Sequence, residues 1–308
     1  MTGISRLTST GVYNQNNYTK KRVVSTPVNT DYTPKKASNK KNWAIAAGIA
    51  TAVLTGTAIL LTKGKALRQK RLLAEIPTDL QARFANIKDL NGKEFVDRAY
   101  KEMVDYMGLS KVAPKEIKIK DTDNAFSVTG GYNPMLNTIE YTQGFMTKLS
   151  KESQLNFLAH ELKHCEQITN MLRTEGITVE KYLEANVDNL LKDVVNNPLN
   201  PNHFRYSMAD TVGKGKEWLS SAKEQIMKHH AQTIEKHYKE VFSTPKIKAD
   251  SPEGKKAYEH LKATAEYEGL GFLGLGGEAY RNNPLEREAY PFGDKIEELF
   301  KKYMRAMG

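Results

Sequence analysis

The chain has 308 residues, of which 39% are hydrophobic and 27% are charged, a composition that is typical of globular proteins and excludes a wholly disordered chain. The net charge is +10, but residues 1–72 hold 13 of the 46 basic residues and one of the 36 acidic residues. Residues 73–308 therefore carry 33 basic and 35 acidic residues, and this near-neutral balance does not predict a nucleic-acid partner.

Residues 1–42 form a basic tail that is rich in Asn, Thr, Ser, Lys and Tyr. The tail has no sustained apolar period, which predicts disorder. Residues 43–62 (WAIAAGIATAVLTGTAILLT) follow and contain no charged residue. A helix of this length would rise about 30 Å, which is the thickness of the hydrocarbon core of a bilayer. We therefore predict one transmembrane helix and a single-pass membrane protein.

Lysines flank the apolar segment on both sides, at Lys40, Lys41, Lys63 and Lys65, where they would meet lipid phosphates. Membrane lipid is thus an expected partner of the anchor and its basic flanks. The alternatives are a buried alanine-rich helix and a cleaved signal peptide, and the late start of the segment disfavours the second. Basic residues within twenty positions number four before and five after the segment, so the orientation in the membrane stays open.

A basic juxtamembrane linker, residues 63–72, leads into the main domain, residues 73–308. The expected elements of that domain run from a helix through short strands to further helices, which predicts an α+β fold. Alternation predicts a strand over 116–121, and two β-prone runs lie within 124–142. The expected helices span residues 93–107, 151–173 (capped by Ser150), 178–195 and 216–242, with another starting at Ser251-Pro252 and a last one near Pro284.

The pattern HELKH occupies residues 160–164, inside the long helix predicted over 151–173. Residues four apart on a helix share a face, so His160 and His164 could both reach one Zn²⁺ ion. Glu161 lies beside them, placed to take a proton from a water held by the metal. The alternative is a structural helix whose histidines are either exposed to solvent or buried in the core with their hydrogen bonds made. A catalytic zinc site differs from it in requiring a third protein ligand and an open fourth position.

The final helix carries EREAY at residues 286–290. Together with HELKH, this motif resembles the gluzincin group of zinc metallopeptidases, in which a glutamate from a later helix joins the two histidines. The resemblance covers roughly residues 115–175 and 280–300, and it implies Glu286 as the third zinc ligand. Glu288 is the reserve candidate and Glu278 a weaker one.

The same resemblance implies a zincin-like domain, with a small sheet that has an edge strand, an active-site helix and a mostly helical C-terminal part. The segment GGYNPMLNTIEYT, residues 130–142, resembles the edge strand that aligns a peptide in these enzymes. Glu286 lies 122 positions after His164, a long separation that we interpret as a helical insertion over residues 177–265. The insertion either covers the active-site cleft that the resemblance implies or has a purely structural role.

The chain departs from the family pattern at Tyr290, where an aspartate usually steadies a zinc-bound histidine. Asp294 is the candidate to replace that support. The implied mechanism is hydrolysis by a zinc-activated water, with Glu161 as general base and then proton donor. A hydrogen-bond donor for the oxyanion is also required, and four residues remain open for this role: His203, Tyr206, Tyr280 and Tyr290.

Other reactive residues have simpler interpretations. Cys165 is the sole cysteine, which excludes an intramolecular disulfide, and its position predicts a small core residue. Three histidines, His229, His230 and His237, are expected on a solvated helix face. The glycine-rich segment 268–280 lacks the features of a phosphate loop and is expected to form a lid or a close approach to the metal.

The sequence therefore predicts a membrane-anchored, zinc-dependent endopeptidase that acts on a peptide or protein substrate. Two alternatives remain open. One is a catalytically impaired zincin-like domain that serves as a membrane-tethered binding or scaffold protein. The other is a helical membrane protein in which the motif arose by chance.

Overall fold

The computed structural model describes residues 64–115, 117–120, 130–196, 215–265 and 281–308. The predicted tail, membrane anchor and glycine-rich segment lie outside these ranges. No helix within the described ranges is both long and apolar enough to cross a bilayer. Residues 64–74, which include most of the expected juxtamembrane linker, are helical.

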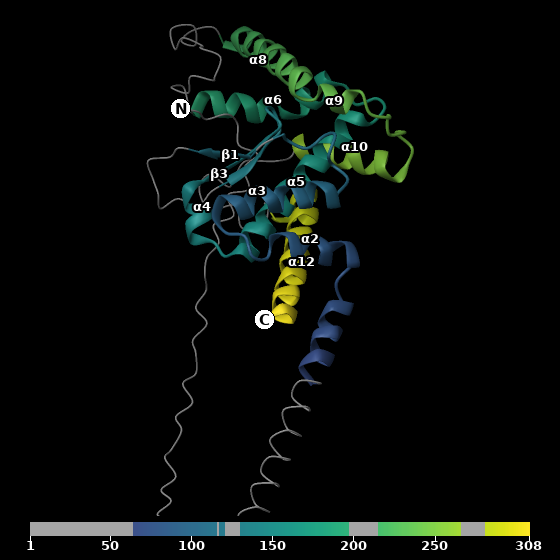
Figure 1. Cartoon of the computed structure of the whole chain (residues 1–308). Coiled ribbons are helices and arrows are strands. Elements are labelled where there is room, and N and C mark those ends of the chain that lie inside the picture. The colour runs from purple at the N-terminus through teal and green to yellow at the C-terminus, as the bar shows by residue number, and fades with distance from the viewer. Residues whose placement is uncertain (1–63, 116, 121–129, 197–214, 266–280) are drawn as a thin grey trace, which may run out of the picture.

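The fold is α+β, as the sequence predicts, with a small mixed sheet and a larger helical part (Figure 1). Strand β3 (Thr138–Thr142) is central; it pairs in parallel with β1 (Ile117–Lys120) and antiparallel with β2 (Gly130–Asn133). In this register Tyr132 lies opposite Ile139. The expectation of an edge strand within 130–142 is confirmed, because β2 pairs only with β3 among the described strands.

Strand β2 lies against the central helix, and Gly130 permits this close approach. A Cβ atom at Gly130 would collide with the ring of Phe157 and would lie 2.9 Å from the carbonyl oxygen of Glu140. Three further helices, α2 (Thr78–Ile87), α3 (Gly92–Tyr106) and α4 (Gln143–Lys148), lie N-terminal to the central helix in the chain. The buried Phe95, Ala99 and Met103 lie on α3, which packs against the central helix.

The central helix is α5 (Lys151–Arg173), and it has the bounds that the sequence predicts. Ser150 caps it, because its side-chain oxygen accepts a hydrogen bond from the backbone N–H of Ser153 at 3.2 Å. Helical spacing in the sequence places an apolar stripe on one face of α5, and in the structure this stripe is fully buried; it consists of Leu155, Leu158, Leu162, Cys165 and Leu172. Burial of this stripe, rather than helix propensity, holds α5 in place.

Helix α12 (Pro284–Met307) packs along α5, which forms more of its contacts with α12 than with any other element (Figure 1). Asn283 caps its first turn by accepting from the N–H of Leu285 at 2.9 Å, and Pro284 occupies the first turn, where a missing N–H costs nothing. Gly293 faces α5 at Asn156, so the two backbones approach closely. The start of α12 is thereby set beside the middle of α5.

The remaining helices belong to the region that the sequence marks as an insertion. They are α6 (Val179–Asn196), α8 (Gly215–His237), α9 (Lys239–Phe242) and α10 (Pro252–Ala265). The single helix expected over 216–242 is divided at Tyr238, whose buried hydroxyl donates to the carbonyl oxygen of Pro134 at 2.6 Å. Helix α10 packs on α5, α6 and α12, so this region is joined to the core of the domain.

We predict that Gly293→Ala destabilises the protein. The added Cβ would lie 2.5 Å from Oδ1 and 2.9 Å from the backbone oxygen of Asn156, so α5 and α12 must separate, at a cost of about 1–3 kcal/mol in the free energy of unfolding. Chemical denaturation measures this loss. Gly64→Ala is the control, because a Cβ there meets nothing within 4 Å. Equal stability of the two variants would contradict the close helix contact.

Candidate metal centre

Three side chains that could ligate a metal meet at the contact between α5 and α12. His160 and His164 come from α5, and Glu286 comes from the first turn of α12. The Nε2 atoms of the two histidines are 3.0 Å apart, and the Glu286 oxygens lie 3.3 Å from His160 Nε2 and 3.4 Å from His164 Nε2. This is the sole group of three or more such side chains that lie close enough to hold a metal ion within the part of the chain that the structure describes.

The spacing of these atoms fits a zinc ion. A tetrahedral site with bonds of about 2.0–2.1 Å places its ligand atoms about 3.3–3.4 Å apart. His160 and Glu286 are 4% and 1% exposed, and the side chain of His164 is 12% exposed. Two imidazoles and a buried carboxylate are a donor set that could hold a metal ion such as zinc.

Glu286 and Glu288 face opposite sides of α12. Glu286 reaches the two histidines, whereas Glu288 contacts Lys256 Nζ at 2.9 Å and His260 Nε2 at 3.1 Å. The first glutamate of the motif is thus the one that joins the histidines. The weaker candidate, Glu278, lies outside the described residues.

When no metal is bound, opposite charges on the histidines and Glu286 stabilise the metal-ligand group. Burial raises the pKa of Glu286, but His164 and His160 outweigh this effect and hold that pKa well below its usual range. Burial lowers the pKa of His164, but the Glu286 carboxylate outweighs burial and raises this pKa to about 9. The positive charge of protonated His164 and the negative charge of Glu286 therefore stabilise each other.

Glu161 lies on the same turn of α5 and is fully buried. Its Oε2 atom accepts a hydrogen bond of 2.7 Å from the backbone N–H of Tyr132, in edge strand β2. The general-base candidate is thus fixed between the metal-ligand group and the strand that was expected to align a peptide. A carboxylate held by a backbone donor has a defined orientation toward its neighbours.

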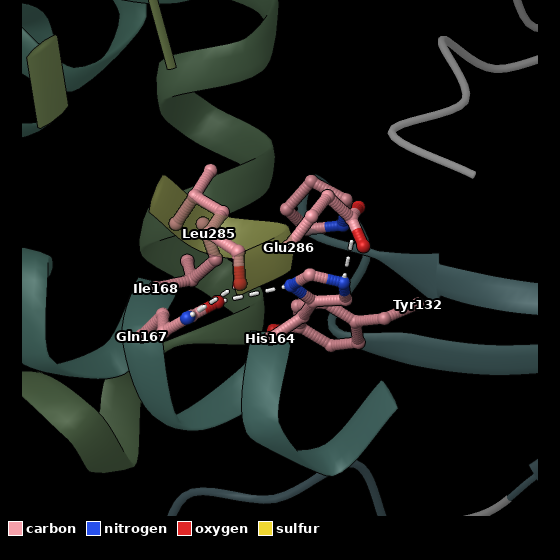
Figure 2. A pocket seen from close by; sticks show the side chains of 7 residues that line it. Tyr132, His164, Gln167, Ile168, Leu285 and Glu286 are labelled. Carbon is pink, nitrogen blue, oxygen red and sulfur yellow. Dashed lines mark hydrogen bonds and ion pairs between the residues drawn. The ribbon is translucent and has the colours of Figure 1, made fainter. Parts of the chain in front are cut away.

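His164 is supported by Gln167, a residue that the sequence motifs did not identify. The Nδ1 atom of His164 lies 2.9 Å from Gln167 Oε1. Figure 2 shows the imidazole of His164 between Gln167 on one side and Glu286 on the other. The expected supporter, Asp294, instead accepts from Asn156 Nδ2 at 3.0 Å. In the sequence, this support is indicated only by a glutamine that follows the second histidine by about one helical turn.

Tyr290 packs against His160, with ring centroids 4.7 Å apart and the rings at 66°. Burial, followed by the charge of Glu286, raises the pKa of Tyr290 to about 12, so its hydroxyl stays protonated at neutral pH. The other three oxyanion candidates, His203, Tyr206 and Tyr280, lie outside the described residues. Tyr290 therefore steadies a ligand by ring packing rather than by the expected carboxylate.

A small cleft opens beside the metal-ligand group (Figure 2). Its polar part is made by His164, Gln167 and Glu286, and apolar atoms supply much of the remainder. The lining residues are Tyr132, Pro134, His164, Gln167, Ile168, Leu285 and Glu286. The polar metal-ligand group thus has an apolar wall beside it, as in many ligand-binding clefts.

The edge strand is also held by helices of the expected insertion. The hydroxyl of Tyr132 contacts the hydroxyl of Tyr238, and Tyr238 donates to the carbonyl oxygen of Pro134. Both tyrosines are buried, and burial raises their pKa values well above the usual range. No local pattern in the sequence indicates this contact, which links residues more than 100 positions apart.

The remaining reactive residues stand apart from the metal-ligand group. Cys165 is buried against Val112 and Asn137, and burial raises the pKa of its thiol to about 12, as expected for a core residue. His229, His230 and His237 lie on α8. The histidine rings of 229 and 230 pack edge to face, and none of the three belongs to the group that could hold a metal.

Comparisons with protein-family models, with curated proteins and with solved structures found no match for this chain.

We predict a pH dependence of stability for the metal-free chain. The folded pKa of His164 is about 9, against 6.5 when unperturbed, so its stabilisation is complete below pH 6.5 and is lost as the pH rises through 9. The lowered pKa of Glu286 makes its contribution complete above pH 4.5 and lost at lower pH. Thermal unfolding with a chelator should show a falling midpoint between pH 6.5 and 9, and His164→Gln should flatten this slope. If His164→Gln leaves the fall of the unfolding midpoint with pH unchanged, the ion pair between His164 and Glu286 is refuted.

We also predict that Tyr238→Phe destabilises the protein, whereas Tyr182→Phe does not. The first change leaves the buried Pro134 oxygen without its donor, at a cost of about 1–2 kcal/mol in the free energy of unfolding. Tyr182 is equally buried, but its hydroxyl has no hydrogen-bond partner among the described residues, so its removal should leave stability unchanged or higher. Denaturation of both variants tests this, and equal losses would count against the Tyr238 contact.

Proposed function

We propose that this protein is a zinc-dependent endopeptidase of gluzincin type, anchored to a membrane by residues 43–62. The observation that carries the proposal is the meeting of His160, His164 and Glu286 at separations of 3.0–3.4 Å, with Glu161 beside them. Two imidazoles and a carboxylate suit zinc better than magnesium or calcium, which prefer oxygen ligands. The ion would be held by these three residues.

A bound zinc ion would supply Lewis-acid chemistry by polarising the scissile carbonyl and lowering the pKa of water. Glu161 would accept the proton of the attacking water and then deliver it to the leaving amine. Its hydrogen bond from the Tyr132 N–H keeps one carboxylate oxygen fixed, which leaves the other oriented for proton transfer.

The protein's own strand would orient the substrate. Strand β2 pairs with β3 and is an edge of the described sheet. The N–H of Tyr132 is already donated to Glu161, so an extended peptide would pair with the other outward-facing backbone groups of β2. Tyr290 is the oxyanion-donor candidate within the described residues, because its ring packs against His160 and a tyrosine hydroxyl can donate a hydrogen bond. These features favour a peptide or an unfolded protein segment as substrate.

The membrane location rests on the sequence. Residues 43–62 form an uncharged stretch of bilayer length, and basic residues on both sides suit anionic lipid. The near-neutral main domain gives no support to a nucleic-acid partner. A membrane-tethered peptidase would act on substrates close to the bilayer surface.

We predict that the full-length chain, purified in detergent, holds about one zinc ion per molecule. Glu286→Ala should lose the ion, because one of three ligands is removed. Glu161→Gln should keep the ion and lower peptide cleavage by about 10²–10⁴-fold, the usual contribution of a general base. Metal analysis and cleavage of an unfolded protein, with a chelator as control, give both measurements.

The outcomes separate the alternatives. If the purified protein contains no zinc, the result would support the alternative in which His160 and His164 are structural residues. A zinc-loaded protein that cleaves nothing would support a membrane-tethered binding or scaffold protein with a zincin-like site. Cleavage by Glu161→Gln at the wild-type rate would refute the role given to Glu161.

A further inference from the structure

A short chain of polar side chains lies behind His164, on the side away from Glu286. Gln167 Oε1 is 2.9 Å from His164 Nδ1, and Gln167 Nε2 lies 3.0 Å from the carbonyl oxygen of Leu285 and 3.5 Å from Glu288 Oε2. Gln167 is 2% exposed, so its amide has little access to water and depends on these neighbours for its hydrogen bonds.

These neighbours determine which way the amide faces. A backbone carbonyl and an ionised carboxylate only accept hydrogen bonds, so the NH₂ group of Gln167 must face Leu285 and Glu288. The carbonyl oxygen of Gln167 must then face His164. Because an amide oxygen only accepts, Nδ1 of His164 must carry the proton and donate it. The lone pair of Nε2 is thereby left for a metal.

Glu288 is fixed in turn by helix α10. Lys256 Nζ lies 2.9 Å from Glu288 Oε2, and His260 Nε2 lies 3.1 Å from Glu288 Oε1. His260 is 4% exposed, so this contact is part of the packed interior. The second glutamate of the EREAY motif is thus placed to orient Gln167.

We infer that Gln167 is a positioning residue of the metal site, which holds His164 as the Nδ1–H tautomer and directs its Nε2 atom at the ion. Leu285 and Glu288 orient the Gln167 amide, and α10 orients Glu288. This inference rests on the proposed zinc-binding function. It assigns the support of His164 to a neutral amide from the same helix, instead of a carboxylate from α12.

The test measures zinc affinity of the full-length chain in detergent by competition with a chromophoric chelator. Gln167→Met keeps the length of the side chain and removes its hydrogen bonds to His164, Leu285 and Glu288. Loss of a side chain that orients a metal-binding histidine usually costs about 10–100-fold in metal affinity, and we expect a loss in that range. An affinity within twofold of wild type would overturn the inference while leaving the proposed function intact.

Gln154→Met is the matched control. Gln154 lies on the same helix, is 3% exposed and donates its amide to the backbone oxygens of Phe145, Met146 and Leu149. It has no contact with the metal-ligand group, so this variant should lose stability and keep its zinc affinity. Equal loss of affinity in both variants would show a general effect of destabilisation and would overturn the inference.

Glu288→Gln is the second variant, for the case in which Gln167→Met does not fold. Its side chain is 25% exposed, and the change removes one of the two acceptors that orient the Gln167 amide, leaving the Leu285 carbonyl. We expect a several-fold loss of zinc affinity, and an unchanged affinity would count against Glu288 as the orienting group. Wild-type protein that binds no zinc would instead refute the proposed function.

Nuclear magnetic resonance of the ring nitrogens gives a readout that a merely structural role would not change. In zinc-loaded wild type, His164 should carry its proton on Nδ1, with slow exchange because Gln167 accepts it. Glu288→Gln should speed this exchange, whereas Gln154→Met should not. A proton on Nε2 of His164 in the zinc-loaded protein would contradict the inference directly.

Discussion

The close contact between α5 and α12 is the constraint on which the site depends. The histidines and Glu286 belong to segments separated by 122 positions, and no local interaction brings them together. Gly293 allows the two helices to approach at Asn156, and the cap at Asn283 sets where α12 begins. The carboxylate of Glu286 is thereby placed within 3.4 Å of both histidines. A small change in this spacing would separate the ligand atoms by more than a metal site tolerates.

The region expected to be an insertion contributes to the site rather than standing beside it. Helix α10 supplies His260 and Lys256 to Glu288, and Tyr238 at the start of α9 holds Pro134 near the edge strand. Each contact acts on a residue next to the group that could hold a metal ion. The additional helices therefore stabilise the surroundings of this group.

The sequence predicted the features that depend on local patterns. The bounds of α5, its buried stripe, the edge strand and the meeting of Glu286 with the two histidines all follow from periodicity, capping and a resemblance of motifs. The support of His164 could not be predicted in this way. The amide of Gln167 contacts Leu285 and Glu288, which lie 118 and 121 positions away, and Tyr132 contacts Tyr238, which lies 106 positions away. Such contacts depend on tertiary packing, which leaves no periodic signal in one sequence.

The exchange of a carboxylate for an amide behind His164 affects the charge of a buried site. The charges of a divalent ion, Glu286 and Glu161 would sum to zero. An aspartate at position 290 would add one negative charge to this group. Uncompensated charge is costly to bury. Glu288 does add a carboxylate nearby, but Lys256 and His260 contact both of its oxygens. Gln167 thus supplies the hydrogen bond that His164 needs without adding a charge, and Tyr290 can pack its ring against His160. Tyr290 in place of an aspartate is therefore compatible with a group that could hold a metal ion, because Gln167, on a different helix, contacts His164 instead.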